Sequence, residues 1–65
     1  MRIFLNDDAH DVDAATLATA LEALGLGGRK IATAVNGRFV PAGARPATPL
    51  ADGDRIEVVA PMQGG

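Results

Sequence analysis

Polar and apolar residues alternate at the start of the chain. From Arg2 to Leu5 the alternation predicts a β-strand that places Ile3 and Leu5 on one face. Asn6–Asp8 are residues that favour turns, and His10–Asp13 predicts a short returning strand. The chain is therefore expected to open with a β-hairpin.

The hydrophobic period then changes from two to between three and four residues. This spacing predicts one stripe of an amphipathic helix, formed by Leu17, Ala20, Leu21 and Leu24. Thr16 is the expected N-cap, with Asp13 as the alternative, and Gly25 is expected to end the helix in a left-handed conformation. Leu26 would fold back onto the last turn. We expect a helix of about three turns.

The second half of the chain predicts another hairpin. Ile31–Val35 is expected to be a strand, Asn36-Gly37 is a strong signal for a tight turn, and Arg38–Val40 would return until Pro41 removes a backbone donor. Residues 41–53 contain three prolines and predict a long irregular stretch in which Leu50 is the clear anchor.

Alternation resumes near the end of the chain, where Ile56 and Val58 are expected to face the helix. The order of hairpin, helix, hairpin and final strand predicts an α+β fold with one main helix on one face of a mixed four- to five-stranded sheet. This is the β-grasp arrangement, with the first and last strands parallel in the middle. We assign residues 1–60 to this domain and residues 61–65 to a flexible C-terminal tail.

Composition narrows the range of functions. The chain has 65 residues, no cysteine and a formal charge of −2, so it predicts one small domain without disulfides or a concentrated basic face for nucleic acid. The apolar run Met1–Leu5 is too short for a signal peptide or a membrane span. We therefore expect a cytoplasmic protein that binds neither nucleic acid nor membrane.

The chain offers no convincing catalytic, metal or cofactor site. His10 is the only histidine and is interpreted as a surface group. The early aspartates lack the glycine and the distal glutamate of a calcium loop. Gly25–Lys30 resembles a phosphate loop, but it ends a helix and is followed by Ile31 rather than Ser or Thr. ATP, if it is used, would be bound by another protein.

The terminal carboxylate of Gly65 remains as the candidate reactive group. Activation as a mixed anhydride with a nucleotide phosphate would give it a good leaving group, which a sulfur nucleophile could displace to form a thiocarboxylate. Residues 61–65, when extended, reach roughly 15 Å beyond the sheet. We expect Met62, Gln63 and Gly64 to enter the active site of a partner, because glycine passes through narrow slots.

A tail of this length binds weakly on its own, since ordering each residue costs on the order of 1–2 kcal/mol. The folded body must therefore supply most of the affinity. Glu57 and Val59 are expected to face outward beside Phe4, on the open side of the sheet. We interpret these three residues as a docking surface, although single exposed apolar residues are also common on ordinary surfaces.

Taken together, the chain resembles the ubiquitin-like sulfur carrier family, most closely the ThiS carriers of thiamine biosynthesis. The resemblance extends over nearly the whole length and rests on Met1–Asn6, Thr16–Leu24, Ala34–Gly37, Val40-Pro41, Leu50–Glu57 and the Gly64-Gly65 end. Residues 42–46 depart from it, because they lack the bulky residue that many relatives carry there. The departure affects the expected fourth strand and its neighbouring loop, not the tail.

The resemblance implies a carrier that is itself no enzyme. A ThiF-type adenylyltransferase would activate the Gly65 carboxylate with ATP, a cysteine desulfurase or related donor would supply sulfur, and a ThiG-type thiazole synthase would receive it. Three alternatives remain open: a carrier for molybdopterin or cysteine synthesis, a ubiquitin-like protein modifier, and a plain binding module. The short chain favours the thiamine pathway, because molybdopterin carriers usually run longer.

Overall fold

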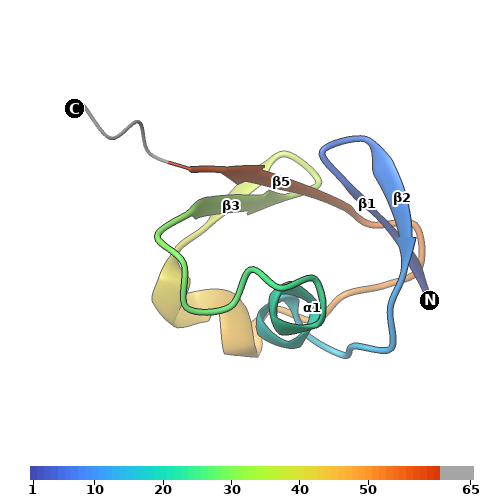
Figure 1. Ribbon diagram of the computed structural model, residues 1–65, viewed down its shortest axis with the longest axis horizontal. Helices are drawn as coiled ribbons and strands as arrows, with labels where there is room; N and C mark the ends of the chain where they lie inside the picture. The colour runs from blue at the N-terminus through green and yellow to red at the C-terminus, as the bar shows by residue number, and fades with distance from the viewer. Residues whose placement is uncertain (61–65) are drawn as a thin grey trace.

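The computed structural model of the protein describes residues 1–60 (Figure 1). One sheet and two helical segments make up this part of the chain. In order they are β1 (Arg2–Leu5), β2 (Asp8–Asp11), α1 (Leu17–Ala23), β3 (Ala32–Val35), β4 (Arg38–Val40), the 3₁₀ helix η1 (Ala42–Ala47) and β5 (Arg55–Val59).

The strands form a single mixed sheet in the order β2-β1-β5-β3-β4. The two ends of the described chain meet at its centre, where β1 pairs in parallel with β5. All other strand pairs are antiparallel. The predicted α+β architecture, with parallel central strands and one main helix on a mixed sheet, is therefore confirmed.

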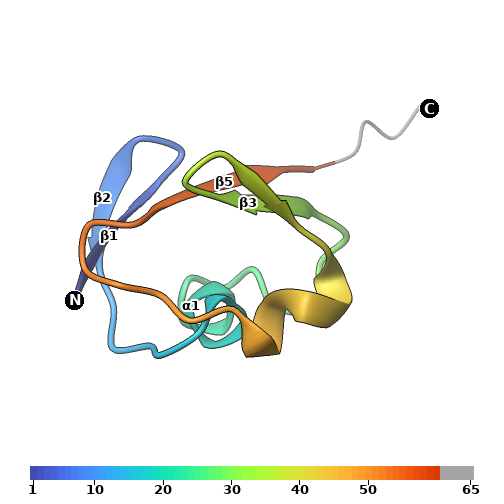
Figure 2. The ribbon, with the colours of Figure 1, turned by 180° about the vertical axis from the view of Figure 1, so that it is seen from behind.

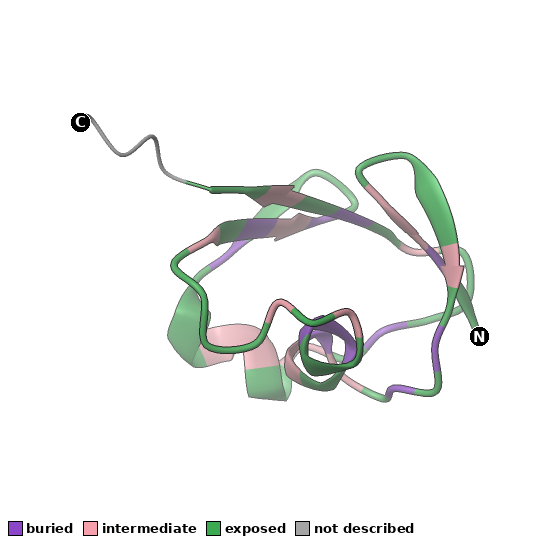
Figure 3. Ribbon diagram, viewed as in Figure 1, coloured by how far each residue is buried: buried purple, intermediate pink, exposed green. Residues whose placement is uncertain are grey.

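The core lies between the sheet and the helical layer, as the burial colours show (Figure 3). Ile3 of β1, Leu17 of α1 and Ile56 of β5 are the largest fully buried apolar side chains at its centre. The remaining buried hydrophobic residues are Val12, Ala14, Ala20, Leu21, Val35, Val40 and Leu50. Leu50 is thus buried as expected.

The first hairpin is tighter than predicted. Asn6 and Asp7 both have left-handed φ angles, of 47° and 73°. Two such residues form a two-residue turn whose twist matches the flanking strands. Asp8 is consequently paired with Leu5, and the returning strand begins there instead of at His10. The expected bounds of this strand were wrong because Asp8 belongs to the strand and not to the turn.

The second hairpin agrees with the sequence pattern. Asn36 and Gly37 have φ angles of 50° and 83°, so this turn is also of the two-residue kind. It places Val35 opposite Arg38. The preceding strand begins at Ala32, one residue later than predicted.

Helix α1 has the predicted ends but is shorter than predicted. Thr16 is the N-cap and forms a capping box with Thr19. At the other end Gly25 is left-handed, with φ of 78°, and the Leu26 amide donates to the Leu21 carbonyl at 2.8 Å. These caps enclose seven residues, which is about two turns.

The stretch after β4 was predicted to be irregular, and this was wrong for Ala42–Ala47, which form η1. Figure 2 shows η1 on the same side of the sheet as α1. The Arg45 side chain fixes it there, donating to the Ile31 carbonyl at 2.6 Å and to Thr33 Oγ1 at 3.1 Å. The signal was missed because this anchoring is long-range and Pro46 lies inside the segment.

Candidate functional site on the open sheet face and at the end of β5

In the part of the chain that the structure describes, one face of the sheet carries no helix. Figures 1 and 2 show α1 and η1 below the sheet and no element above it. Along β5 the side chains alternate between the two faces: Ile56 is 1% exposed, whereas Glu57 and Val59 are exposed. The predicted inward and outward positions of this strand are therefore confirmed.

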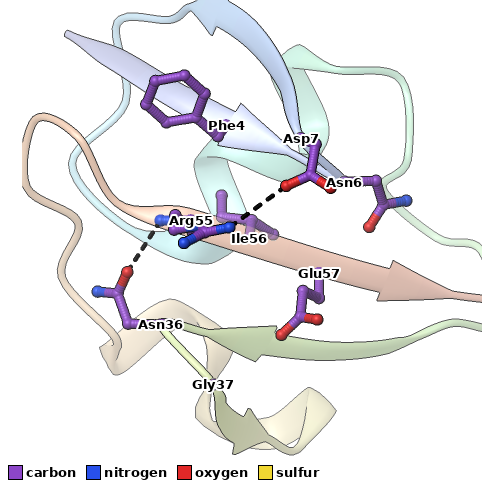
Figure 4. Close-up of a pocket in the computed structure, with 8 residues that line it drawn as sticks. All are labelled: Phe4, Asn6, Asp7, Asn36, Gly37, Arg55, Ile56 and Glu57. Atoms are coloured by element: carbon purple, nitrogen blue, oxygen red, sulfur yellow. Dashed lines mark hydrogen bonds and ion pairs between the residues drawn. The ribbon is translucent and has the colours of Figure 1, made fainter.

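The three residues expected to form a docking surface do not all lie together. Phe4 is half-buried and pairs in register with Arg55, and it lines the same hollow as Glu57 (Figure 4). Val59 is four residues further along β5 than Arg55, a separation of roughly 13 Å at strand spacing. Glu57 lies beside the Phe4 position, but Val59 belongs to a different part of the surface.

The hollow beside Phe4 is polar. It lies where the two hairpin turns approach the start of β5, and Figure 4 shows the Arg55 side chain between Asp7 and Asn36. Arg55 Nη2 is 3.4 Å from Asp7 Oδ1, and both side chains are largely exposed. Exposed ion pairs of this kind contribute at most about 1 kcal/mol to stability. The shape of the hollow is therefore set mainly by the two hairpin turns.

Sequence reasoning missed Phe39 as a residue of this face. Its side chain is 70% exposed, the most exposed of the large hydrophobic residues in the described chain. Phe39 lies opposite Ala34, and Ala34 lies opposite Glu57, so all three share the open face. The two-residue Asn36-Gly37 turn fixes this register. Counting outward from the turn along both strands would have placed Phe39 opposite Ala34.

Asn6 attaches β5 to the first hairpin. Its side-chain carbonyl accepts from the Val58 amide at 2.9 Å, and its Nδ2 donates to the Val58 carbonyl at 3.2 Å. The Asn6 side-chain amide therefore pairs with β5 as a strand backbone would, and it extends the pairing beyond the two register pairs between β1 and β5. This contact fixes the second half of β5, which leads to the tail.

The predictions for the tail itself lie outside the described residues. These are the modification at Gly65 and the entry of Met62, Gln63 and Gly64 into partner active sites. The structure does describe where the tail begins, because the central strand β5 ends at Val59.

Two further findings concern residues 1–60. No three histidine, aspartate or glutamate side chains in this part come together as a metal-binding group. None of its helices has the length and apolar character needed to cross a membrane. The aspartates of the first hairpin lie at its turn and along the outer strand β2.

The fold defines the class of protein. One helix on a mixed sheet, with the first and last strands parallel at its centre, is the β-grasp fold of ubiquitin-like proteins. Among solved structures, the chain is similar over its full length to the crystal structure of a thiamine biosynthesis protein (ThiS) from Geobacter metallireducens, with a TM-score of 0.82 and 29% identity. An NMR structure of a thiamine biosynthesis protein from the same organism gives a TM-score of 0.76 at 29% identity, with 88% of that chain covered.

Sequence comparison agrees with the structural likeness. The chain is 36% identical over 63 residues to the sulfur carrier protein ThiS of Thermus thermophilus, covering 97% of this chain and 98% of that protein. The sequence model of the ThiS family matches residues 3–65. The chain belongs to the ThiS family.

Proposed function

We propose that the protein carries sulfur for the synthesis of the thiazole part of thiamine, as a thiocarboxylate at Gly65. The observation that supports this most directly is that the family match extends through residue 65, so Gly64 and Gly65 lie within the region shared with the family. The curated relative from Thermus thermophilus bears the name of a sulfur carrier, and the alignment covers 98% of its length.

The proposed chemistry begins with a carboxylate, which is an anion at neutral pH and resists nucleophiles. A ThiF-type adenylyltransferase transfers the AMP part of ATP to a Gly65 oxygen and releases pyrophosphate. A sulfide-level nucleophile then displaces AMP together with that oxygen, leaving one sulfur on the carbonyl. A cysteine desulfurase or related donor supplies this sulfur as a persulfide, and a thiol reductant provides the two electrons that bring it to the sulfide level. A ThiG-type thiazole synthase accepts this sulfur in the cytoplasm.

In this proposal the β-grasp body binds partners and performs no catalysis. The open face presents Phe4 and Glu57 at the polar hollow and Phe39 on β4. Val59 lies at the end of β5, where the tail begins. Both partners would dock on this side, because a five-residue tail that costs on the order of 1–2 kcal/mol per ordered residue needs additional contacts.

Mass spectrometry tests the proposal. The chain is incubated with ATP, the ThiF-type enzyme and a sulfur source. We expect a mass gain equal to the exchange of one oxygen for one sulfur. Removing Gly65 should abolish the gain, whereas Gly43→Ala, which adds a Cβ where nothing lies within 4 Å, should retain it.

Other outcomes would assign the chain elsewhere. An unchanged mass with an enzyme that modifies another carrier in the same assay would reject the proposal. Conjugates joined to lysines of other proteins would favour a ubiquitin-like modifier. Transfer of the sulfur to a molybdopterin synthase or a cysteine-forming enzyme, but not to thiazole synthase, would place the carrier in that pathway.

A further inference from the structure

A second hollow lies where β5 ends, and we call it the exit hollow. It lies at the edge of the sheet between the start of β3 and the start of η1. Its lining includes the apolar Ile31, Ala42 and Val59 and the basic Arg29, Lys30 and Arg45. Three of the six lysine and arginine residues of the chain therefore meet beside the beginning of the tail, and none of the acidic residues within positions 1–60 lines the hollow.

This local charge is opposite to that of the whole chain, which has a formal charge of −2. The two ion pairs found within residues 1–60 join Arg2 to Asp11 and Arg55 to Asp7. Neither pair involves a cation of the exit hollow. None of these cations therefore forms an ion pair with a carboxylate of residues 1–60, and the exposed Arg29 and Lys30 are available to an external partner.

Hydrogen bonds fix the Arg45 side chain and the backbone turn that leads to Arg29. Arg45 donates to the Ile31 carbonyl and to Thr33 Oγ1, so its guanidinium is fixed behind the hollow. Arg29 follows a turn in which its amide donates to the Leu26 carbonyl at 3.4 Å and Gly28 has a φ of 78°. Gly28 is the third residue of this turn, where a positive φ favours glycine. The turn directs the chain so that Arg29 and Lys30 reach the rim.

We propose that the exit hollow docks an acidic, apolar-centred lip around the channel by which the ThiF-type adenylyltransferase receives the tail. The inference rests on the proposed function, because only a protein that takes the tail must come this close. Five residues span at most roughly 15 Å when fully extended, so the mouth of any such channel must lie near Val59. Complementary charge at that mouth would raise the rate of encounter and align the tail with the channel.

Charge reversal tests this inference. The double variant Arg29→Glu/Lys30→Glu reverses two rim charges, whereas Arg2→Glu/Arg38→Glu makes the same net change on strands β1 and β4, away from the hollow. Binding to the ThiF-type adenylyltransferase is measured by calorimetry at low and high ionic strength. We expect the hollow variant to bind at least about tenfold more weakly at low ionic strength, with a smaller difference at high ionic strength. The control variant should stay within about twofold of the original chain.

Steady-state kinetics adds a second readout of the docking step. The apparent KM for the carrier should rise in the hollow variant while kcat at saturation stays close to that of the original chain. A neutral variant, Arg29→Gln/Lys30→Gln, should have an apparent KM between those of the hollow variant and the original chain. Circular dichroism and urea unfolding of every variant establish that each one is folded.

The possible failures are distinguishable. If the original chain gains no sulfur, the proposed function fails and the exit hollow loses its role with it. If the original chain is modified but the hollow variant binds as tightly as the control, the function stands and the inference is overturned. Equal weakening of both double variants would also overturn it, because overall charge would then explain the effect.

Discussion

The Asn6 side chain bonds the first hairpin to the second half of the strand that leads to the tail. Its amide makes two hydrogen bonds to Val58, and its backbone has a φ of 47°. We expect Asn6→Ala to lower the free energy of unfolding by about 2 kcal/mol, because it loses both bonds and strains the turn. Urea unfolding measures the loss, and amide hydrogen exchange at Val58 should become faster.

Asn6→Gly separates the two contributions. Glycine accepts a positive φ but makes no side-chain bond, so this variant should lose only about half as much stability. Equal losses for glycine and alanine would mean that backbone strain contributes nothing. An Ala variant as stable as the original chain would contradict the role assigned to the amide. No pattern in the sequence could reveal this contact, since Asn6 and Val58 are 52 positions apart.

Among the elements, α1 has so few residues that its ends decide much of its stability. Gly25 has a φ of 78°, whereas Gly43 in η1 has no positive φ, and an added Cβ meets nothing within 4 Å at either position. Gly25→Ala should therefore cost about 1 kcal/mol through backbone strain alone. Gly43→Ala should be neutral or stabilising by up to about 1 kcal/mol. Thermal and urea unfolding compare the pair, and similar losses in both would refute the conformational argument.

The 3₁₀ helix η1 depends on one side chain for its attachment to the sheet. Arg45 bonds both the Ile31 carbonyl and the buried Thr33 hydroxyl, which is 2% exposed. Arg45→Met should lower the free energy of unfolding by about 2 kcal/mol, and Arg45→Lys should recover little, because a single ammonium does not match two separated acceptors. Urea unfolding of both variants is the measurement. Full recovery with lysine would show that charge alone matters.

How well each element could be predicted depends on whether its determinants are local. Asn36-Gly37 and the Thr16 and Gly25 caps act within a few residues, and the second hairpin and the helix ends were predicted correctly. Asp7 is a non-glycine residue in a left-handed conformation, so the start of β2 was misplaced. For η1 the decisive contact joins Arg45 to residues more than ten positions away, which no local pattern contains.

At the scale of the whole molecule, the alternation of polar and apolar residues was enough to assign side chains to a face of the sheet. It could not show which side chains on that face lie next to one another. The outward positions of Glu57 and Val59 follow from a period of two. Their distances from Phe4 depend on the register of β1 against β5, which is a tertiary property. The exit hollow is harder still to foresee, because Arg29, Arg45 and Val59 meet there from three separate segments.

The division of the chain into a body and a tail gives a last prediction. Within residues 1–60, every buried hydrophobic residue lies between Ile3 and Ile56, so the described core ends in strand β5. A chain ending at Ala60 should therefore keep its free energy of unfolding to within about 0.5 kcal/mol, the range of an ordinary surface change. Urea unfolding compares the two lengths. A loss above about 1 kcal/mol would mean that residues 61–65 pack on the body, and that the terminus must be released before it can react.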